Sequence, residues 1–345
     1  MTGMNNRDMD HTEMDKRNVR SRGMKIPEVE ETEIKVGVSS CLLGYEVRYD
    51  GQHKLDRYVR DVLGEYFDYV PVCPEQECGL PTPREAMRLE GDVENPKLVT
   101  NKTHIDHTDR MLDYAKTKLD KLEKEELHGF IFKKDSPSSG LYRVKVYNAK
   151  GVGEKKGSGL FAGAFVKRFP NIPVEEEGRM NDPHLRENFI VRVFAHYRWK
   201  EFLKSEPSVG ELVEFHTREK LLLMAHSVEH YKSLGRLTAQ GGKLSREELF
   251  SKFEEIFLEG LTFSATLKKN TNVLHHILGY FKKDLSPWEK QEVLSLVDRY
   301  HEGQVPLVVP MTLLNHFINK YDKAYLKKQR YLNPHPKELM LRNKV

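Results

Sequence analysis

The sequence predicts an α/β domain followed by an all-helical domain. Short apolar runs alternate with amphipathic segments in the first half, a pattern typical of a mostly parallel, Rossmann-like sheet with helices between its strands. After about residue 182, Gly and Pro become rare and helical periodicity dominates. A chain of 345 residues is long enough for two domains that each have a core of their own.

The first half begins with a segment that predicts no packed structure. Residues 1–32 are rich in charge and are expected to form a disordered leader, so the first domain should cover 33–180. Apolar runs predict the strands, and apolar residues at helical spacing predict the helices between them. The expected strands are 34–40, 69–73, 129–132, 144–146 and 172–174, and the expected helices are 55–65, 108–127 and 159–169.

The second half shows long helical patterns and no internal repeat. Ser245 followed by Glu248, and Ser286 followed by Glu289, match the start of a helix with a capping box. We expect a helical domain over 181–331 and a basic tail over 332–345. The expected helices are 185–202, 208–235, 245–261, 270–281, 286–303 and 310–331.

Charge and hydropathy exclude some classes of protein. With 38% hydrophobic and 31% charged residues, and with no apolar stretch of membrane-spanning length or secretory leader, the sequence predicts a cytoplasmic protein. The formal net charge is only +4, but residues 320–345 carry eight basic and two acidic side chains. Such an end is typical of a solvated tail, or of a segment that contacts nucleic-acid phosphates.

The chain has three cysteines, Cys41, Cys73 and Cys78. Cys41 and Cys73 each end an apolar run, and the carboxyl ends of parallel strands meet at the edge of the sheet where ligands bind. Their odd number argues against a disulfide framework. Three thiols at this edge could hold a metal cluster with one position left for substrate, fit a zinc site loosely, or be inert core residues.

Four segments of the first half together resemble the thiouracil desulfidase family over roughly residues 34–178. They are 38–51 around Cys41, 72–84 around Cys73, Ser136-Pro137-Ser138-Ser139-Gly140, and 143–147. The resemblance implies an enzyme that removes sulfur from thiolated pyrimidines with a 4Fe–4S cluster held by three cysteines. It implies hydrolysis of C=S to C=O, without redox, at the iron that has no protein ligand.

One departure from the family concerns the third ligand. The family segment reads Ser-Pro-Ser-Cys-Gly, whereas this chain has Ser139 at the fourth position. The resemblance therefore implies Cys41 and Cys73 as ligands, and we expect Cys78 to supply the third thiolate. Ser139 is the possible substitute ligand, although soft thiolate suits iron better than oxygen does. Loss of the cluster is the remaining alternative.

The resemblance also implies catalytic side chains beside the cluster. Glu75 is expected to move protons to and from water and the ring nitrogen, and Ser136 and Ser138 to orient water or a uracil oxygen. The alternatives are a helix-capping carboxylate for Glu75 and ordinary turn chemistry for the serines.

Residues 214–227 and 230–237 resemble the helical YbgA-type domain. Its fusion to a desulfidase domain is typical of the RudS branch of the family, which converts 4-thiouridine in tRNA to uridine, so tRNA is the expected partner. His226 and His230 also have the i,i+4 spacing of zinc ligands, but position 227 is Ser rather than the Glu of a zincin. The alternatives are an RNA-binding protein without a cluster and a desulfidase of free thiouracil. The expected RNA contacts are His216, Arg218, Lys220, His226, His230 and Arg236.

Overall fold

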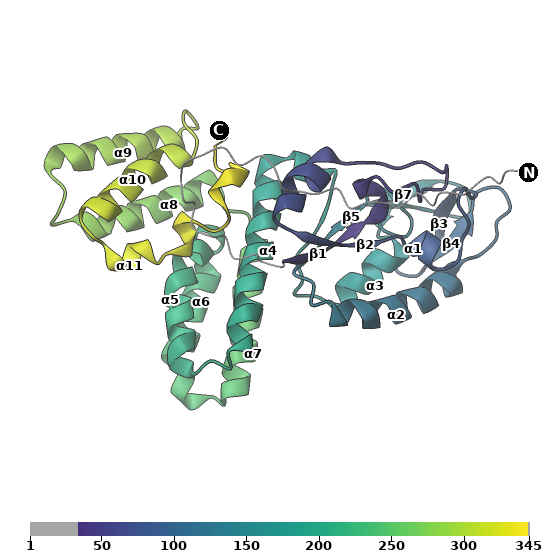
Figure 1. Ribbon diagram of the computed structural model, residues 1–345, viewed down its shortest axis with the longest axis horizontal. Coiled ribbons are helices and arrows are strands. Elements are labelled where there is room, and N and C mark those ends of the chain that lie inside the picture. Colours follow the sequence, from purple (N-terminus) through teal and green to yellow (C-terminus); the bar gives the residue numbers. More distant parts are fainter. Residues whose placement is uncertain (1–33, 344–345) are drawn as a thin grey trace, which may run out of the picture. The chain divides into compact units, whose positions relative to one another are not determined.

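The computed structural model describes residues 34–343, so the expected leader over 1–32 lies outside the described residues. These residues form a parallel sheet, a mixed sheet and an all-helical half (Figure 1), which confirms the predicted fold class. Within the described part of the chain, no helix combines the length and apolar character needed to cross a membrane.

The parallel sheet has the strand order β2-β1-β5-β8. Its strands are β1 (Lys35–Ser39), β2 (Asp68–Val72), β5 (Gly129–Phe132) and β8 (Val174–Glu176), and every neighbouring pair is parallel. The strands expected at 34–40, 69–73 and 129–132 are confirmed. The last strand starts later than the expected residue 172, at the residue after Pro173, because proline has no N–H to donate to a ladder.

Both faces of this sheet are covered. On one face, Phe130 and Phe132 pack against α2 (Thr108–Lys124) and α3 (Leu160–Arg168). On the other, Val36 and Ile131 pack against the helical turns at Tyr58–Glu65 and against α4 (Pro183–Lys204). Gly37 allows this close packing, since a Cβ there would lie 2.2 Å from the Phe130 ring.

The second sheet has the order β4-β3-β6-β7. Of its strands, β3 (Met87–Gly91), β4 (Pro96–Thr100), β6 (Val144–Tyr147) and β7 (Gly153–Gly157), only β6 was expected from the sequence. Leu89, Leu98, Val144 and Val146 are buried, so one face of this sheet joins the core and the other faces solvent.

The helical half contains α5 (Val209–His226), α6 (Val228–Ala239), α7 (Arg246–Thr262), α8 (Leu267–Leu278), α9 (Pro287–His301), α10 (Val308–Lys320) and α11 (Ala324–Lys327). The expected helix 208–235 is two helices, because Ser227 is extended and its side chain caps α6. The expected helix 310–331 likewise ends at Lys320.

Helix α4 belongs to two hydrophobic cores. Phe189 and Val193 pack with the parallel sheet, whereas Val191, Ala195 and Trp199 pack with the helical half. The two halves therefore share one helix, and cutting the chain within α4 would remove part of the cover of the sheet.

The C-terminal segment is folded rather than a solvated tail, contrary to our expectation. Leu339 and Leu341 are buried in the core between the parallel sheet and α4, the core that also contains Phe189. Arg342 donates to Glu187 Oε1 at 2.8 Å and to the Tyr331 carbonyl at 2.6 Å. The prediction of a solvated tail rested on the basic charge of this segment. The segment has few apolar residues, but these pack into the core and hold it in place.

Candidate active site

Cys41 and Cys73 follow two adjacent parallel strands. After β1, residues Ser40–Leu43 form a 3₁₀ turn that places Cys41 at the sheet edge, and Gly44 closes the turn with φ = 101°. After β2, Cys73 precedes α1 (Pro74–Glu77), and its N–H donates to Glu77 Oε1 at 2.8 Å. Both cysteines are buried, at the edge where the sequence placed them.

The serine loop 136–139 follows β5, which is hydrogen-bonded to β1. The N–H of Gly140 donates to the Ser136 carbonyl at 2.8 Å, and the N–H of Gly159 donates to the Gly140 carbonyl at 2.7 Å. A Cβ on Gly159 would lie 2.4 Å from the Ser138 backbone, so only glycine allows the loop to lie this close to the start of α3.

These three strand ends enclose a cavity of about 430 Å³. Its lining includes Cys41, Cys73, Glu75, Ser136 and Ser139. Ser138 does not line the cavity and is fully buried. A cavity of this size at the carboxyl edge of an α/β sheet is typical of a small-molecule site.

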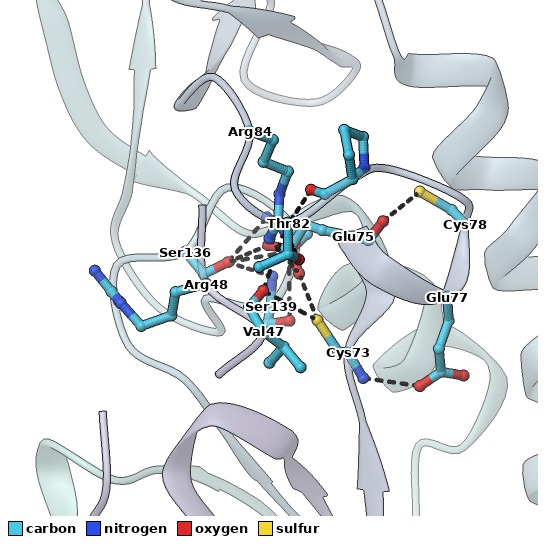
Figure 2. Close-up of polar contacts among 12 residues, drawn as sticks. Val47, Arg48, Cys73, Glu75, Glu77, Cys78, Thr82, Arg84, Ser136 and Ser139 are labelled. Atoms are coloured by element: carbon cyan, nitrogen blue, oxygen red, sulfur yellow. Dashed lines mark hydrogen bonds and ion pairs between the residues drawn. The ribbon is translucent and has the colours of Figure 1, made fainter. Parts of the chain in front are cut away.

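Glu75 connects the serine loop to Cys73 (Figure 2). Its Oε1 accepts hydrogen bonds from Ser138 Oγ at 2.5 Å and from Ser136 Oγ at 3.3 Å. Its Oε2 lies 3.6 Å from Cys73 Sγ and 3.9 Å from Arg84 Nη2. Glu75 therefore has a fixed orientation in a site that contains a thiol, two hydroxyls and a guanidinium group.

The alternative role of helix cap belongs to Glu77 rather than to Glu75. Glu77 accepts from the Cys73 N–H, from the Tyr114 hydroxyl at 2.8 Å and from Lys118 Nζ at 2.8 Å. The sequence analysis missed Glu77. The signal that could have found it is a carboxylate four residues after a cysteine that ends a strand.

The pKa of Cys41 is raised to about 11 and that of Cys73 to about 12. Burial is the main cause for both thiols, and the negative charge of the nearby Glu75 carboxylate is the second. Lys133 and Arg48 act in the opposite direction on the Cys41 pKa, and Arg84 does so on the Cys73 pKa. Without a bound cation both thiols therefore hold their protons at neutral pH, and a metal must displace those protons to bind.

Cys78 is not part of this cavity. It lies at the C-terminal end of α1, where its thiol donates to the Glu75 carbonyl oxygen at 3.2 Å (Figure 2) and its side chain packs against the core that contains Phe130. The prediction that Cys78 joins Cys41 and Cys73 does not fit this geometry. Ser139 does line the cavity, and the long 3.4 Å contact with Ser138 Oγ is the only hydrogen bond that its buried hydroxyl makes within residues 34–343.

The donor set at the cavity is thus two thiols and one hydroxyl. Cys41, Cys73 and Ser139 come from three neighbouring strand ends, and cationic side chains that favour thiolates lie beside them. Two donors have the softness that iron–sulfur clusters need, and the third position offers oxygen. Within residues 34–343, no group of three His, Cys, Asp or Glu side chains is arranged to hold a single metal ion.

The structure separates the histidines expected to face RNA. His216 and His226 are buried, and burial lowers the pKa of each to about 4. His226 ends α5 and His230 lies in α6, so the break at Ser227 removes the common helix face that zinc binding requires. Both histidines have local partners, since His226 Nδ1 is 2.7 Å from the Phe263 carbonyl and His230 Nδ1 is 2.7 Å from Ser227 Oγ.

The cationic candidates in the same region are only partly available to a partner. Arg218 pairs with Glu214 at 2.5 Å, and Lys220 Nζ lies 4.9 Å from the centre of the Tyr325 ring. Arg236 is exposed and donates only to Ser233 Oγ, at 3.1 Å, among described residues. RNA contact by these side chains stays a prediction.

Comparison with known proteins finds a family profile that matches part of each half of the chain. The profile of the 2-thiouracil desulfurase family matches residues 36–177, and that of a protein of unknown function (DUF1722) matches residues 220–336. The uncharacterized protein YbbK of Bacillus subtilis (strain 168) is 35% identical over 152 residues, which are 42% of this chain and 97% of YbbK. The chain belongs to the 2-thiouracil desulfurase family.

Two further relatives cover one half of the chain each. The uncharacterized protein YbgA of Escherichia coli (strain K12) is 28% identical over 165 residues, which are 48% of this chain and 98% of YbgA. The solved [4Fe–4S]-dependent thiouracil desulfidase TudS is 32% identical, with 44% of this chain and 95% of that chain covered and a TM-score of 0.36. The desulfurase match contains the complete cavity lining, from Ser39 to Ser139.

Proposed function

We propose that this protein removes sulfur from 4-thiouridine in tRNA, converting C=S to C=O and releasing hydrosulfide. We further propose that a 4Fe–4S cluster is its cofactor and that Cys41, Cys73 and Ser139 hold it. The observation that carries the proposal is the cavity in which these three donors and Glu75 meet, within a chain of the 2-thiouracil desulfurase family. The [4Fe–4S] dependence of the similar desulfidase TudS supports the choice of cofactor.

The bound cluster would supply a Lewis-acid iron that polarises the C–S bond. The net reaction adds one water molecule to the thiocarbonyl carbon and releases sulfur as hydrosulfide, so no electron acceptor is needed. Glu75 would accept a proton from the attacking water through Oε2, the oxygen that is not hydrogen-bonded to the serines. One proton of that water leaves with the sulfur as hydrosulfide, and the other passes to solvent.

The serines and Arg84 would have different tasks. Ser136 lines the cavity and could donate to a uracil oxygen, whereas the buried Ser138 hydroxyl holds Glu75 in place and so acts as a positioning residue. Arg84 is nearly buried and donates to the Val47 carbonyl at 3.1 Å, which fixes its charge beside Glu75. These contacts orient the groups before substrate binds, and such preorganisation is a main source of catalytic rate.

One observation favours a second function. Ser139 stands where the family has a thiolate ligand, and a hydroxyl is a much poorer donor to iron. A chain that had lost its cluster for this reason would be a binding protein that recognises RNA without changing it.

Anaerobic reconstitution with iron and sulfide separates the two functions. We expect the full chain to bind close to four irons, Cys41→Ala and Cys73→Ala to lose the cluster spectrum, and Cys78→Ala to retain it as the matched control. Ser139→Ala should weaken the cluster, whereas Ser139→Cys, which supplies the thiolate of the family segment, should keep iron content and spectrum at least at the level of the parent. A wild-type protein without iron after reconstitution, or a Cys78→Ala variant without its cluster, would contradict the ligand set.

A further inference from the structure

Three cations lie side by side across the solvent-facing side of the second sheet. The parallel register pairs Leu89 with Val146 and Glu90 with Tyr147, which places Arg88 beside Lys145. The antiparallel register pairs Lys145 directly with Lys155. The row Arg88–Lys145–Lys155 therefore crosses β3, β6 and β7, while Val144 and Val146 point into the core.

Two of the three cations in this row have no acidic partner among the residues that the structure describes. Within residues 34–343, Lys145 and Lys155 form no ion pair, and both are exposed. Arg88 pairs with Glu90 and lies 5.2 Å from the centre of the Tyr147 ring. Like charges directly opposite each other destabilise a sheet, so the pairing of Lys145 with Lys155 opposes the stability of β6 and β7.

The row lines a second cavity, of about 390 Å³, next to the active-site cavity. The two cavities share Met87, Asp135 and Pro137 in their linings. Asp135 is the single acidic side chain among the lining residues of the second cavity, against the three cations of the row. An anion bound here would thus lie beside a group held in the active site.

We propose that the Arg88–Lys145–Lys155 row binds the phosphate backbone of an RNA strand next to the base that enters the active-site cavity. A base turned out of its stack remains joined to phosphates on both sides, so an RNA substrate must place phosphates near the mouth of the cavity that holds its base. Ammonium and guanidinium groups are the usual ligands of these phosphates. The assignment rests on the proposed function and adds to it a binding surface on the N-terminal half of the chain.

The test is equilibrium binding of unmodified tRNA, which has no sulfur to lose, by the full-length protein at several salt concentrations. In the variant Lys145→Glu/Lys155→Glu we expect affinity to fall roughly tenfold or more and the slope of log affinity against log salt to decrease by about 2. The matched control is Lys116→Glu/Lys121→Glu, which makes the same change of charge on exposed residues of α2. Circular dichroism and unfolding midpoints check that both variants fold as the parent does.

Three results would overturn the inference. The first is tRNA affinity of Lys145→Glu/Lys155→Glu equal to that of the parent. The second is equal weakening in both double variants, which would show an effect of net charge alone, and the third comes from a small anion. Uridine 5′-monophosphate is the small-anion arm: if it displaces tRNA at concentrations near those of tRNA itself, the row is a mononucleotide site rather than an RNA surface. If the parent desulfurates no substrate but only Lys145→Glu/Lys155→Glu loses tRNA affinity, the proposed function fails and the surface assignment stands.

Discussion

Replacing Leu341 with alanine tests whether the C-terminal segment is part of the core. Leu341 is 9% exposed and packs in the same core as Phe189 and Ile190 of α4. Burying a leucine contributes about 1.5–3 kcal/mol, and leucine-to-alanine changes in cores cost about 2–5 kcal/mol. Because Leu341 keeps 9% of its surface exposed and so lies at the margin of this core, we expect a loss in the lower part of this range, about 2–3 kcal/mol.

Urea unfolding of the full chain measures this loss. The matched control is the adjacent Met340→Ala, whose parent side chain is 64% exposed and whose change should stay within about 0.5 kcal/mol. The midpoint should fall for Leu341→Ala with little change in slope. Equal unfolding free energies for the two variants would refute our account of this segment. That account would also be refuted if the Leu341→Ala variant stayed folded but lost tRNA affinity, because the segment would then act in binding rather than in the core.

Three further predictions concern single side chains. Glu75→Gln should keep the iron of the reconstituted protein but lower the desulfuration rate about 10²–10⁴-fold, and an unchanged rate would reduce Glu75 to a structural residue. His216 and His226 are buried with pKa values of about 4, below the ordinary 6.5, so the unfolded chain binds protons first and the unfolding free energy should fall as pH drops from 6.5 towards 4; a flat profile in that window would contradict their burial. Arg198→Met leaves the carboxylate of Glu219, 2% exposed, without its 2.7 Å partner and should cost about 3–5 kcal/mol in a denaturant titration, whereas a loss below about 1 kcal/mol would show that the pair is not buried in solution.

The parallel sheet could be predicted because its strands are continuous apolar runs. The same reasoning missed β7, whose residues Gly153–Gly157 include no large apolar side chain, so nothing in the pattern distinguishes it from a loop. Strand β3 was missed for a related reason, since one charged row faces solvent and only Leu89 is fully buried. Sheets with one solvated face and short strands leave a weak signal in the sequence.

The site shows the same division. Strand ends placed Cys41 and Cys73 together without a structure, because sheet topology brings those ends to one edge. Spacing along the chain could not place Cys78: α1 is a single turn, and Cys78 comes after its end, where the thiol meets a carbonyl instead of the cavity. The break at Ser227 had a similar effect on His226 and His230, since an i,i+4 spacing implies a common face only within one helix.

The most direct test of the proposed function is single-turnover reaction of the anaerobically reconstituted full-length protein with tRNA that contains 4-thiouridine. The measurement follows the thiouridine absorbance and the hydrosulfide released. The proposed function predicts loss of the thiouridine, one hydrosulfide per base converted and uridine in the digested product, with no reaction by Cys41→Ala. Tight binding of the tRNA by iron-loaded protein, with the thiouridine intact and no hydrosulfide released, would contradict it.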